Sequence, residues 1–274
     1  MTLSAEQVRQ YREHGWIAPI DVMSLDEARA LRAQLEDAEK AFPEHLGAEN
    51  RNNPHLVLPF LGALTIDPRI VDSVEALVGP SISLWSTVLF IKAPSSGSFV
   101  SWHQDATYMA LASDNHVTAW LALSPSTLDS GCVSVIPGSH RDGMRQHVDT
   151  FGDDNILTRG QEVQGVEARD AVHLELQPGQ MSLHHPWLVH GSQPNRSSDR
   201  RIGIAMQSYM GDDVRPVRGE HFVTHVRGAA TNPAFTEAPL PTELCSPSAI
   251  AHRIAANEAF ANILYDGAKE RRDL

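Results

Sequence analysis

The chain has 274 residues, of which 42% are hydrophobic and 20% charged, and its formal net charge at pH 7 is −12. This acidic balance argues against binding to nucleic acids and to anionic membranes, since both need basic patches. The sequence contains no stretch of about 18 apolar residues that would predict a membrane span, and its charged N-terminal sequence is unlike a secretory signal. We therefore expect a soluble cytoplasmic protein. Homo-oligomers are neither indicated nor excluded.

Four helix starts carry N-cap signals, in which a Ser or Asp side chain can accept a hydrogen bond from the first turn. Two have Gln or Glu three residues later, the spacing of a capping box, and two are followed directly by proline. The four caps are Ser4 (with Gln7), Ser24 (with Glu27), Asp67 (before Pro68) and Ser246 (before Pro247). The last of these helices is expected to reach about Tyr265.

From residue 82 the sequence changes to segments rich in β-branched and aromatic residues, separated by Gly, Pro, Ser and Asn. These segments predict strands at 82–92, 116–124, 131–137, 180–185 and 200–210. Residues 139–180 are polar and irregular, and TFGDDNILTRGQE within them predicts a long loop of the kind that is often functional.

Helices followed by strands without intervening helices indicate an α+β, mostly β fold with an antiparallel sheet or barrel. Repeats and linkers are not visible, so we expect a single domain over residues 1–274. Its expected parts are a helical region to about residue 80, a strand core over about 82–212 and a C-terminal helical segment over about 246–266.

A histidine and an aspartate lie two residues apart in SWHQDATYM, residues 101–109. In a strand such residues point to the same face, so His103 and Asp105 would aim at one point. Two histidines with one carboxylate are the ligand set of non-haem Fe(II) oxygenases, but the pair alone is weak, because a local hydrogen bond explains most such spacings. A thiolate zinc site is not expected, since Cys132 and Cys245 are far apart.

Several motifs in order give the chain a resemblance to the phytanoyl-CoA dioxygenase family of Fe(II)- and 2-oxoglutarate-dependent oxygenases. The motifs are WHQD (102–105), TAWLAL (118–123), GCVSVIPGSH (131–140), HHPWLVHGSQPN (184–195) and RR (200–201). The resemblance implies a double-stranded β-helix, the jelly-roll core of cupin-like proteins, with N-terminal and flanking helices. It also implies an enzyme that uses Fe(II), 2-oxoglutarate and O2.

Carried over to this sequence, the resemblance implies that His103, Asp105 and His190 hold the iron and form the catalytic centre. In the family the last histidine of the segment H-P-x-x-x-H-G-S is the ligand, which selects His190. We expect the two other histidines of this segment, His184 and His185, to be a strand-end pair satisfied by hydrogen bonds.

The family's cosubstrate arginine lies eleven residues beyond the distal histidine, which implies that Arg201 binds 2-oxoglutarate. In the predicted strand RIGIAMQ, Arg201 shares a face with Gly203 and Ala205. These small neighbours leave room for a dicarboxylate, which a guanidinium can grip bidentately. Arg200 has the opposite parity and is expected to be exposed.

Four further residues are expected near the cosubstrate. Thr118 and Trp120 share one face of their strand, and the resemblance implies that they line the 2-oxoglutarate pocket, although they could equally be a plain strand threonine and a core tryptophan. Ser192 follows the distal His-Gly and could reach a carboxylate. Lys92 lies where some family members use a lysine near the cosubstrate, and an exposed edge position is the alternative.

The resemblance implies decarboxylation of 2-oxoglutarate to succinate, coupled to oxidation of an unactivated C–H bond in a small molecule. Asp105 favours hydroxylation, because halogenating relatives lack this carboxylate. The flanking segments resemble bacterial hydroxylases of small metabolites such as 2-aminoethylphosphonate and betaine-like compounds. For a substrate of this kind we expect contacts from Tyr108, Asn53, His55, Arg159 and Gln161.

Other functions stay open at this stage. Met109, beside the iron strand, suits an apolar natural-product substrate, and hence tailoring by hydroxylation, cyclisation or orthoester formation. A cupin-like metal-binding protein without 2-oxoglutarate chemistry would keep the three metal residues but have no use for Arg201. A catalytically silent barrel would be favoured by loss of a ligand or of the arginine, and neither is lost.

Overall fold

The computed structural model describes residues 2–47, 50–229 and 232–271. Its α-helices are α1 (Ala5–His14), α2 (Leu25–Ala41), α3 (Pro43–Leu46), α4 (Pro59–Thr65), α5 (Pro68–Val78) and α6 (Pro247–Leu264). The four predicted caps are confirmed, since the side chains of Ser4, Ser24, Asp67 and Ser246 each accept a hydrogen bond from the first turn. Within these described ranges, no helix combines the length and the hydropathy needed to cross a membrane.

Two sheets build the core, and they are antiparallel except where β12 meets β13. The larger sheet has the order β1-β9-β4-β11-β2-β12-β13, and the smaller one the order β3-β10-β5-β8. The larger sheet consists of β1 (Trp16–Asp21), β2 (Ile82–Lys92), β4 (His116–Ala122), β9 (Gln180–His184), β11 (Arg201–Met210), β12 (Phe222–Arg227) and β13 (Thr236–Glu237). The smaller sheet consists of β3 (Val100–His103), β5 (Val133–Val135), β8 (Val172–Leu174) and β10 (His190–Ser192). The predicted jelly-roll with flanking helices is therefore confirmed.

The segment 139–180, predicted as irregular, contains several short elements. These are the 3₁₀ helices η3 (Ser139–Asp142) and η4 (Ala168–Asp170), the strand pair β6 (His147–Val148) and β7 (Glu162–Val163), and β8. Between β6 and β7 the chain has no regular structure, so the predicted loop around residues 150–161 is present. Two more 3₁₀ helices, η1 (Pro54–Leu56) and η2 (Asp105–Tyr108), lie elsewhere in the chain.

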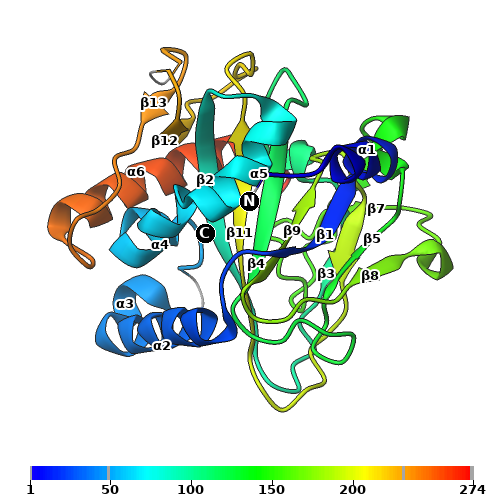
Figure 1. Ribbon diagram of the computed structural model, residues 1–274, viewed down its shortest axis with the longest axis horizontal. Helices are drawn as coiled ribbons and strands as arrows, with labels where there is room; N and C mark the ends of the chain where they lie inside the picture. The colour runs from blue at the N-terminus through cyan, green and yellow to red at the C-terminus, as the bar shows by residue number, and fades with distance from the viewer. Residues whose placement is uncertain (1, 48–49, 230–231, 272–274) are drawn as a thin grey trace.

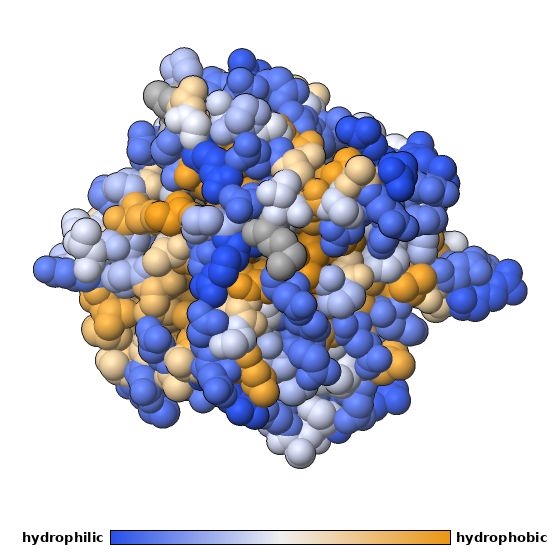
Figure 2. Space-filling model, in the orientation of Figure 1, coloured by the Kyte–Doolittle hydropathy of each residue, from blue (hydrophilic) through white to orange (hydrophobic). Residues whose placement is uncertain are grey.

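Helices cover one side of the larger sheet and leave the other side to the smaller sheet. Figure 1 shows α2, α3, α4 and α6 on the left of the larger sheet and β3, β5 and β8 of the smaller sheet on the right. The face seen in Figure 2 is mostly hydrophilic, with apolar residues in separate patches. The arrangement leaves the space between the two sheets as the place where polar side chains can meet out of contact with solvent.

Alternation along β11 gives its two faces different roles. Ile202, Ile204 and Met206 are fully buried in the main hydrophobic core, which includes residues of α5. Arg201 and Ala205 point to the opposite face and line a cavity between the sheets. The period of two in the sequence thus separates the structural face of the strand from the face available for chemistry, as its parity predicted.

Candidate active site

Two histidines face each other across neighbouring strands of the smaller sheet. His103 is the last residue of β3 and His190 the first of β10, and they are direct partners in the antiparallel ladder. The centroids of their rings lie 4.1 Å apart. Gly191 permits this approach, because a Cβ there would lie 2.9 Å from the carbonyl oxygen of Val100. The strand pairing therefore brings two imidazoles from distant parts of the chain to one point.

Backbone carbonyls decide which nitrogen of each ring is free. Nδ1 of His103 donates to the carbonyl of Ser101 at 2.9 Å, and Nδ1 of His190 donates to that of Leu188 at 3.0 Å. A carbonyl only accepts, so each neutral ring carries its proton on Nδ1. Both Nε2 atoms keep a lone pair for a metal ion, as in metal-ligating histidines whose other nitrogen is bonded to a carbonyl.

Asp105 joins the two histidines from a turn. β3 ends at His103 and Asp105 opens η2, so the two residues do not share a strand, and the strand geometry expected from their spacing is wrong. The turn nevertheless directs Oδ1 of Asp105 toward both rings, at 3.5 Å from Nε2 of His103 and 3.6 Å from Nε2 of His190. The convergence predicted from the sequence is present, with a different local structure behind it.

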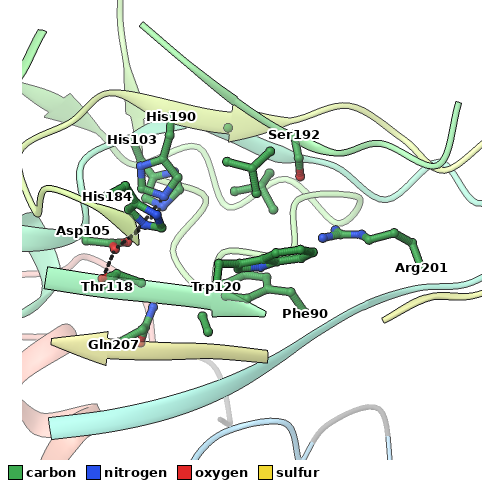
Figure 3. Close-up of a pocket in the computed structure, with 14 residues that line it drawn as sticks. Phe90, His103, Asp105, Thr118, Trp120, His184, His190, Ser192, Arg201 and Gln207 are labelled. Atoms are coloured by element: carbon green, nitrogen blue, oxygen red, sulfur yellow. Dashed lines mark hydrogen bonds and ion pairs between the residues drawn. The ribbon is translucent and has the colours of Figure 1, made fainter. Parts of the chain in front are cut away.

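The second oxygen of Asp105 is held by two side chains of the larger sheet. The hydroxyl of Thr118 donates to Oδ2 at 2.8 Å, and Nε2 of His184 lies 3.3 Å from the same atom. Thr118 on β4 and His184 on β9 are direct cross-strand partners, and Figure 3 shows both beside Asp105. Because Oδ2 is occupied, Oδ1 is the oxygen left for a metal ion.

The three side chains have the geometry and the ionisation of a metal site. One ligand atom from each of His103, Asp105 and His190 lies within 4.8 Å of the others, and all three residues are buried. Burial, helped by the neighbouring His103, keeps the pKa of His190 well below its usual value. Burial opposes ionisation of Asp105, but the histidines around it outweigh this effect and hold its pKa well below its usual range. Two imidazoles and a carboxylate fit Fe(II) and leave further coordination positions open.

Arg201 lies at the other end of the cavity that the three metal residues line (Figure 3). It is only 1% exposed, and its Nε and Nη2 have no hydrogen-bond partner among the described residues. Burial lowers the pKa of its guanidinium to about 10, which leaves it charged at neutral pH. A buried cation with two unsatisfied donors is costly unless an anionic ligand pairs with it. The cavity therefore suits an anion at the Arg201 end.

Trp120 occupies the space left by Gly203, the small residue that follows Arg201 two positions later in the strand. A Cβ on Gly203 would lie 1.9 Å from the indole ring of Trp120, and the guanidinium carbon of Arg201 lies 5.3 Å from the ring centroid. Gly203 thus admits the indole and does not itself border a dicarboxylate site, contrary to expectation. Ala205 does line the cavity, as expected.

Lys92 is buried and not an exposed edge residue, and it acts on the cavity through Ser192. Its Nζ donates to Oγ of Ser192 at 2.6 Å and also to the carbonyl of Gln193. Burial and the nearby Arg201 lower the pKa of Lys92 to about 6. Ser192 lines the cavity, and because its oxygen accepts from Lys92, its own O–H is left to donate into the cavity.

A second cavity of about 230 Å³ adjoins the first at the metal residues. The two cavities share Phe90, His103, Asp105 and Gln207 in their walls. Of the five residues expected to contact the substrate, Tyr108 lines this second cavity.

The other four residues expected to contact the substrate lie outside both cavity walls. The amide of Asn53 is bonded to the side chains of Ser86 and Asn257, and His55 lies between two threonine hydroxyls. Arg159 pairs with the carboxylate of Asp149 at 2.6 Å. The backbone carbonyl of Gln161 accepts a hydrogen bond from a serine hydroxyl. The side chains of Asn53, His55 and Arg159 therefore have structural partners in place, whereas Oε1 of Gln161 is buried without a hydrogen-bond partner among the described residues.

Sequence reasoning missed the position of His184 and the aromatic wall of the second cavity. His184 was expected to be an ordinary strand-end histidine, but it lies against Asp105 and its Nδ1 has no partner within the described chain. The signal in the sequence is its place in a strand next to that of Thr118, which no spacing within one segment reveals. Trp85 on β2 and Phe260 on α6 line the second cavity although 175 positions separate them.

Comparisons with known proteins agree with this geometry. The family model described as phytanoyl-CoA dioxygenase matches residues 11–203, more than two thirds of the chain. A probable alpha-ketoglutarate-dependent hypophosphite dioxygenase of Stutzerimonas stutzeri is 26% identical over 237 residues, covering 78% of this chain and 81% of that protein. The peroxisomal phytanoyl-CoA dioxygenase of Homo sapiens is 31% identical over 172 residues, which cover 60% of this chain and 51% of the human protein, so the match spans about half of the human enzyme.

Two solved structures show the same fold. The apo form of a non-heme monooxygenase, ThoJ, is 29% identical with a TM-score of 0.85 and covers 97% of this chain and 100% of that chain. The apo form of EctD from S. alaskensis is 22% identical with a TM-score of 0.65 and covers 87% of this chain and 89% of that chain. At this lower identity the likeness is one of fold.

Proposed function

The chain belongs to the phytanoyl-CoA dioxygenase family of Fe(II)- and 2-oxoglutarate-dependent dioxygenases, and we propose that its reaction is the hydroxylation of an unactivated C–H bond in a small molecule. The observation that carries the proposal is the pairing, in one cavity, of a three-residue metal group with a buried arginine whose donors lack partners.

His103, Asp105 and His190 would hold the iron through Nε2, Oδ1 and Nε2. Bound there, Fe(II) supplies the activation of O2, in a reaction that converts substrate, 2-oxoglutarate and O2 into hydroxylated substrate, succinate and CO2. The chain's own part is to present two neutral imidazoles and one carboxylate oxygen in fixed orientations. Asp105 fills the position that a halide would need, which favours hydroxylation over halogenation.

Arg201 would bind the distal carboxylate of 2-oxoglutarate. Its partnerless Nε and Nη2 match the two oxygens of a carboxylate in a bidentate pair. Ser192, with its hydroxyl directed by Lys92, supplies another donor near the same end. Thr118 has its hydroxyl committed to Asp105, so its contribution would be to orient the metal ligand, and Trp120 would form the wall.

The first cavity measures only about 30 Å³, far less than the cavity of about 150 Å³ that holds one benzene molecule. A five-carbon dicarboxylate therefore enters only when lining side chains move. Phe90 is placed for this role, because it lines both cavities and is only partly buried. We expect 2-oxoglutarate binding to displace this ring toward the second cavity.

A calorimetric titration under argon tests the proposal. Protein loaded with Fe(II) should bind 2-oxoglutarate at least about a hundredfold more tightly than 2-oxobutyrate, which lacks the distal carboxylate, since a charge-assisted bidentate pair contributes about 3 kcal/mol. Equal affinity for the two acids would contradict the assignment of Arg201. A cupin-like protein without 2-oxoglutarate chemistry, the second candidate, would show no preference at all.

A further inference from the structure

A substrate would reach the metal through the second cavity, and the residues in its walls determine which kind of molecule fits. It extends from His103 and Asp105, past Tyr108, to Phe260 on α6. Residues 155–158 of the long loop form another side. The site therefore joins η2, the irregular loop and the last helix, three elements that lie far apart in the sequence.

Aromatic and aliphatic groups make one wall of this cavity. The rings of Trp85 and Phe260 meet edge to face, with centroids 5.1 Å apart and an interplanar angle of 73°. Met109 and Leu157, both buried, extend the apolar surface. A cavity of about 150 Å³ holds one benzene molecule, so a cavity of about 230 Å³ has room for a ring with substituents. Flat faces of this kind favour a planar partner.

Several polar groups of the cavity are uncharged. The hydroxyl of Tyr108 is buried without a hydrogen-bond partner among the described residues, so its O–H is left to donate to a ligand. The side chains of Asn52 and Gln207 line the cavity. Hydroxyl and amide groups exchange hydrogen bonds with carbonyl, amide or hydroxyl substituents of a ligand.

Charged groups in the walls argue against a substrate that carries an ammonium group. Asp105, to which the metal would bind, is the only acidic side chain among the lining residues of the described chain, and Arg51 is the only arginine or lysine among them. The guanidinium of Arg51 donates to the carbonyl of Ile91. An ammonium placed here would be desolvated without a carboxylate to pair with it, at a cost of several kcal/mol.

We propose that the substrate of this site is an aromatic or heteroaromatic ring compound that carries carbonyl, amide or hydroxyl groups and no ammonium group. The inference rests on the hydroxylase function proposed above, and it disfavours the compact aminophosphonates suggested by sequence resemblance. The ring stacks against Trp85 and Phe260, while Tyr108 donates to a carbonyl group of the substrate. A C–H bond near the ring then faces the metal residues and becomes C–OH, as one O2 and one 2-oxoglutarate become succinate and CO2 plus the new hydroxyl.

Calorimetry on the protein loaded with Fe(II) and 2-oxoglutarate under argon tests the inference. Indole-3-carboxamide and benzamide serve as ring compounds, and 2-aminoethylphosphonate and glycine betaine serve as compact zwitterions. We expect at least one ring compound to bind about tenfold or more tightly than either zwitterion. Tighter binding of 2-aminoethylphosphonate would overturn the inference, and so would tighter binding of glycine betaine, whose trimethylammonium could use the aromatic faces alone.

Variants separate the cavity from nonspecific binding. Tyr108→Phe should weaken indole-3-carboxamide binding about three- to tenfold, the effect of one hydrogen bond, and Phe260→Leu should weaken it through the lost ring face. Tyr265→Phe is the matched control, because it also removes the hydroxyl of a buried tyrosine, while Tyr265 lies outside the cavity wall. An equal loss in Tyr265→Phe and Tyr108→Phe would overturn the assignment.

The same samples distinguish this inference from the proposed function. After air is admitted, succinate is measured without any added ring compound and again with it. Succinate formation together with preference for a zwitterion would refute the substrate class and keep the hydroxylase. Ring binding in a protein that neither binds 2-oxoglutarate nor forms succinate would refute the hydroxylase and support the ligand class.

Discussion

Replacing Arg201 by methionine should stabilise the ligand-free protein while greatly lowering its affinity for 2-oxoglutarate. The guanidinium is buried, charged and short of partners. Methionine has a similar reach and needs no hydrogen bonds, so Arg201→Met removes the charge without opening a large cavity. A ligand that neutralises the charge of Arg201 would explain why the fold contains a side chain that lowers its stability.

The size of both effects follows from the structure. Lowering the pKa of Arg201 from 12.5 to about 10 corresponds to a cost of about 3 kcal/mol for the charged form. The contact with Trp120 returns about 0.5 to 2 kcal/mol of this. Arg201→Met should therefore raise the stability of the ligand-free protein by about 1 to 2.5 kcal/mol, or about 2 to 10 °C in melting temperature. Its affinity for 2-oxoglutarate should fall about a hundredfold or more.

Thermal denaturation with and without 2-oxoglutarate measures both effects in one assay. Arg200→Met is the matched control, because the neighbouring Arg200 points away and pairs with Glu39 at 2.8 Å. This control should lose at most about 1 kcal/mol of stability and keep its response to 2-oxoglutarate. An Arg201→Met protein that is less stable than wild type, or that is stabilised by 2-oxoglutarate as wild type is, would refute the reasoning.

Three further predictions concern groups around the site and in the core. Thr118→Val removes one of the two partners of Asp105 Oδ2. The dissociation constant for Fe(II) should then rise about tenfold, as for other side chains that orient metal ligands. Unchanged Fe(II) affinity in a metal-competition titration would count against the orienting role. Lys92→Met should raise the KM for 2-oxoglutarate about three- to tenfold with little change in kcat, because Ser192 loses the donor that directs its hydroxyl. A fall in kcat alone in steady-state assays would contradict this prediction. Burial lowers the pKa of His55 to about 3, so the unfolded chain binds a proton that the folded chain excludes between pH 6.5 and about 3. Stability is thus fully present above about 6.5 and weakens by about 1.4 kcal/mol per pH unit below it for this residue, and urea titrations at pH 7, 5.5 and 4.5 should show a smaller slope for His55→Gln than for wild type.

The residues of the candidate metal site could be predicted because several motifs in order give the chain its family resemblance, and two of these motifs contain His103, Asp105 and His190. His103 and His190 lie outside the strands predicted from the sequence, and the antiparallel pairing of β3 with β10 brings them together in the structure. Arg201 follows from parity along a single strand, which places it opposite the hydrophobic face. Such features depend on backbone periodicity, which the sequence expresses directly.

The remaining parts of the site depend on partners that no local pattern reveals. Asn53 and His55 lie at η1, in a segment whose resemblance to hydroxylases of small metabolites suggested substrate contacts, but both bond to strand residues more than 30 positions away. His184 reaches Asp105 only through the register between β4 and β9. The ring wall of the second cavity needs α6 to pack beside β2, and a helix with apolar residues all round gives no direction for that packing.

The most direct test of the central claim is the yield of succinate from 2-oxoglutarate in air, measured on protein reconstituted with Fe(II) under argon. We expect wild type and Arg200→Met to form succinate, and Asp105→Ala and Arg201→Met to form none above the protein-free rate at the same 2-oxoglutarate concentration. Wild-type protein shown to hold iron but forming no more succinate than Asp105→Ala would contradict the assignment of this chain as a working 2-oxoglutarate-dependent dioxygenase.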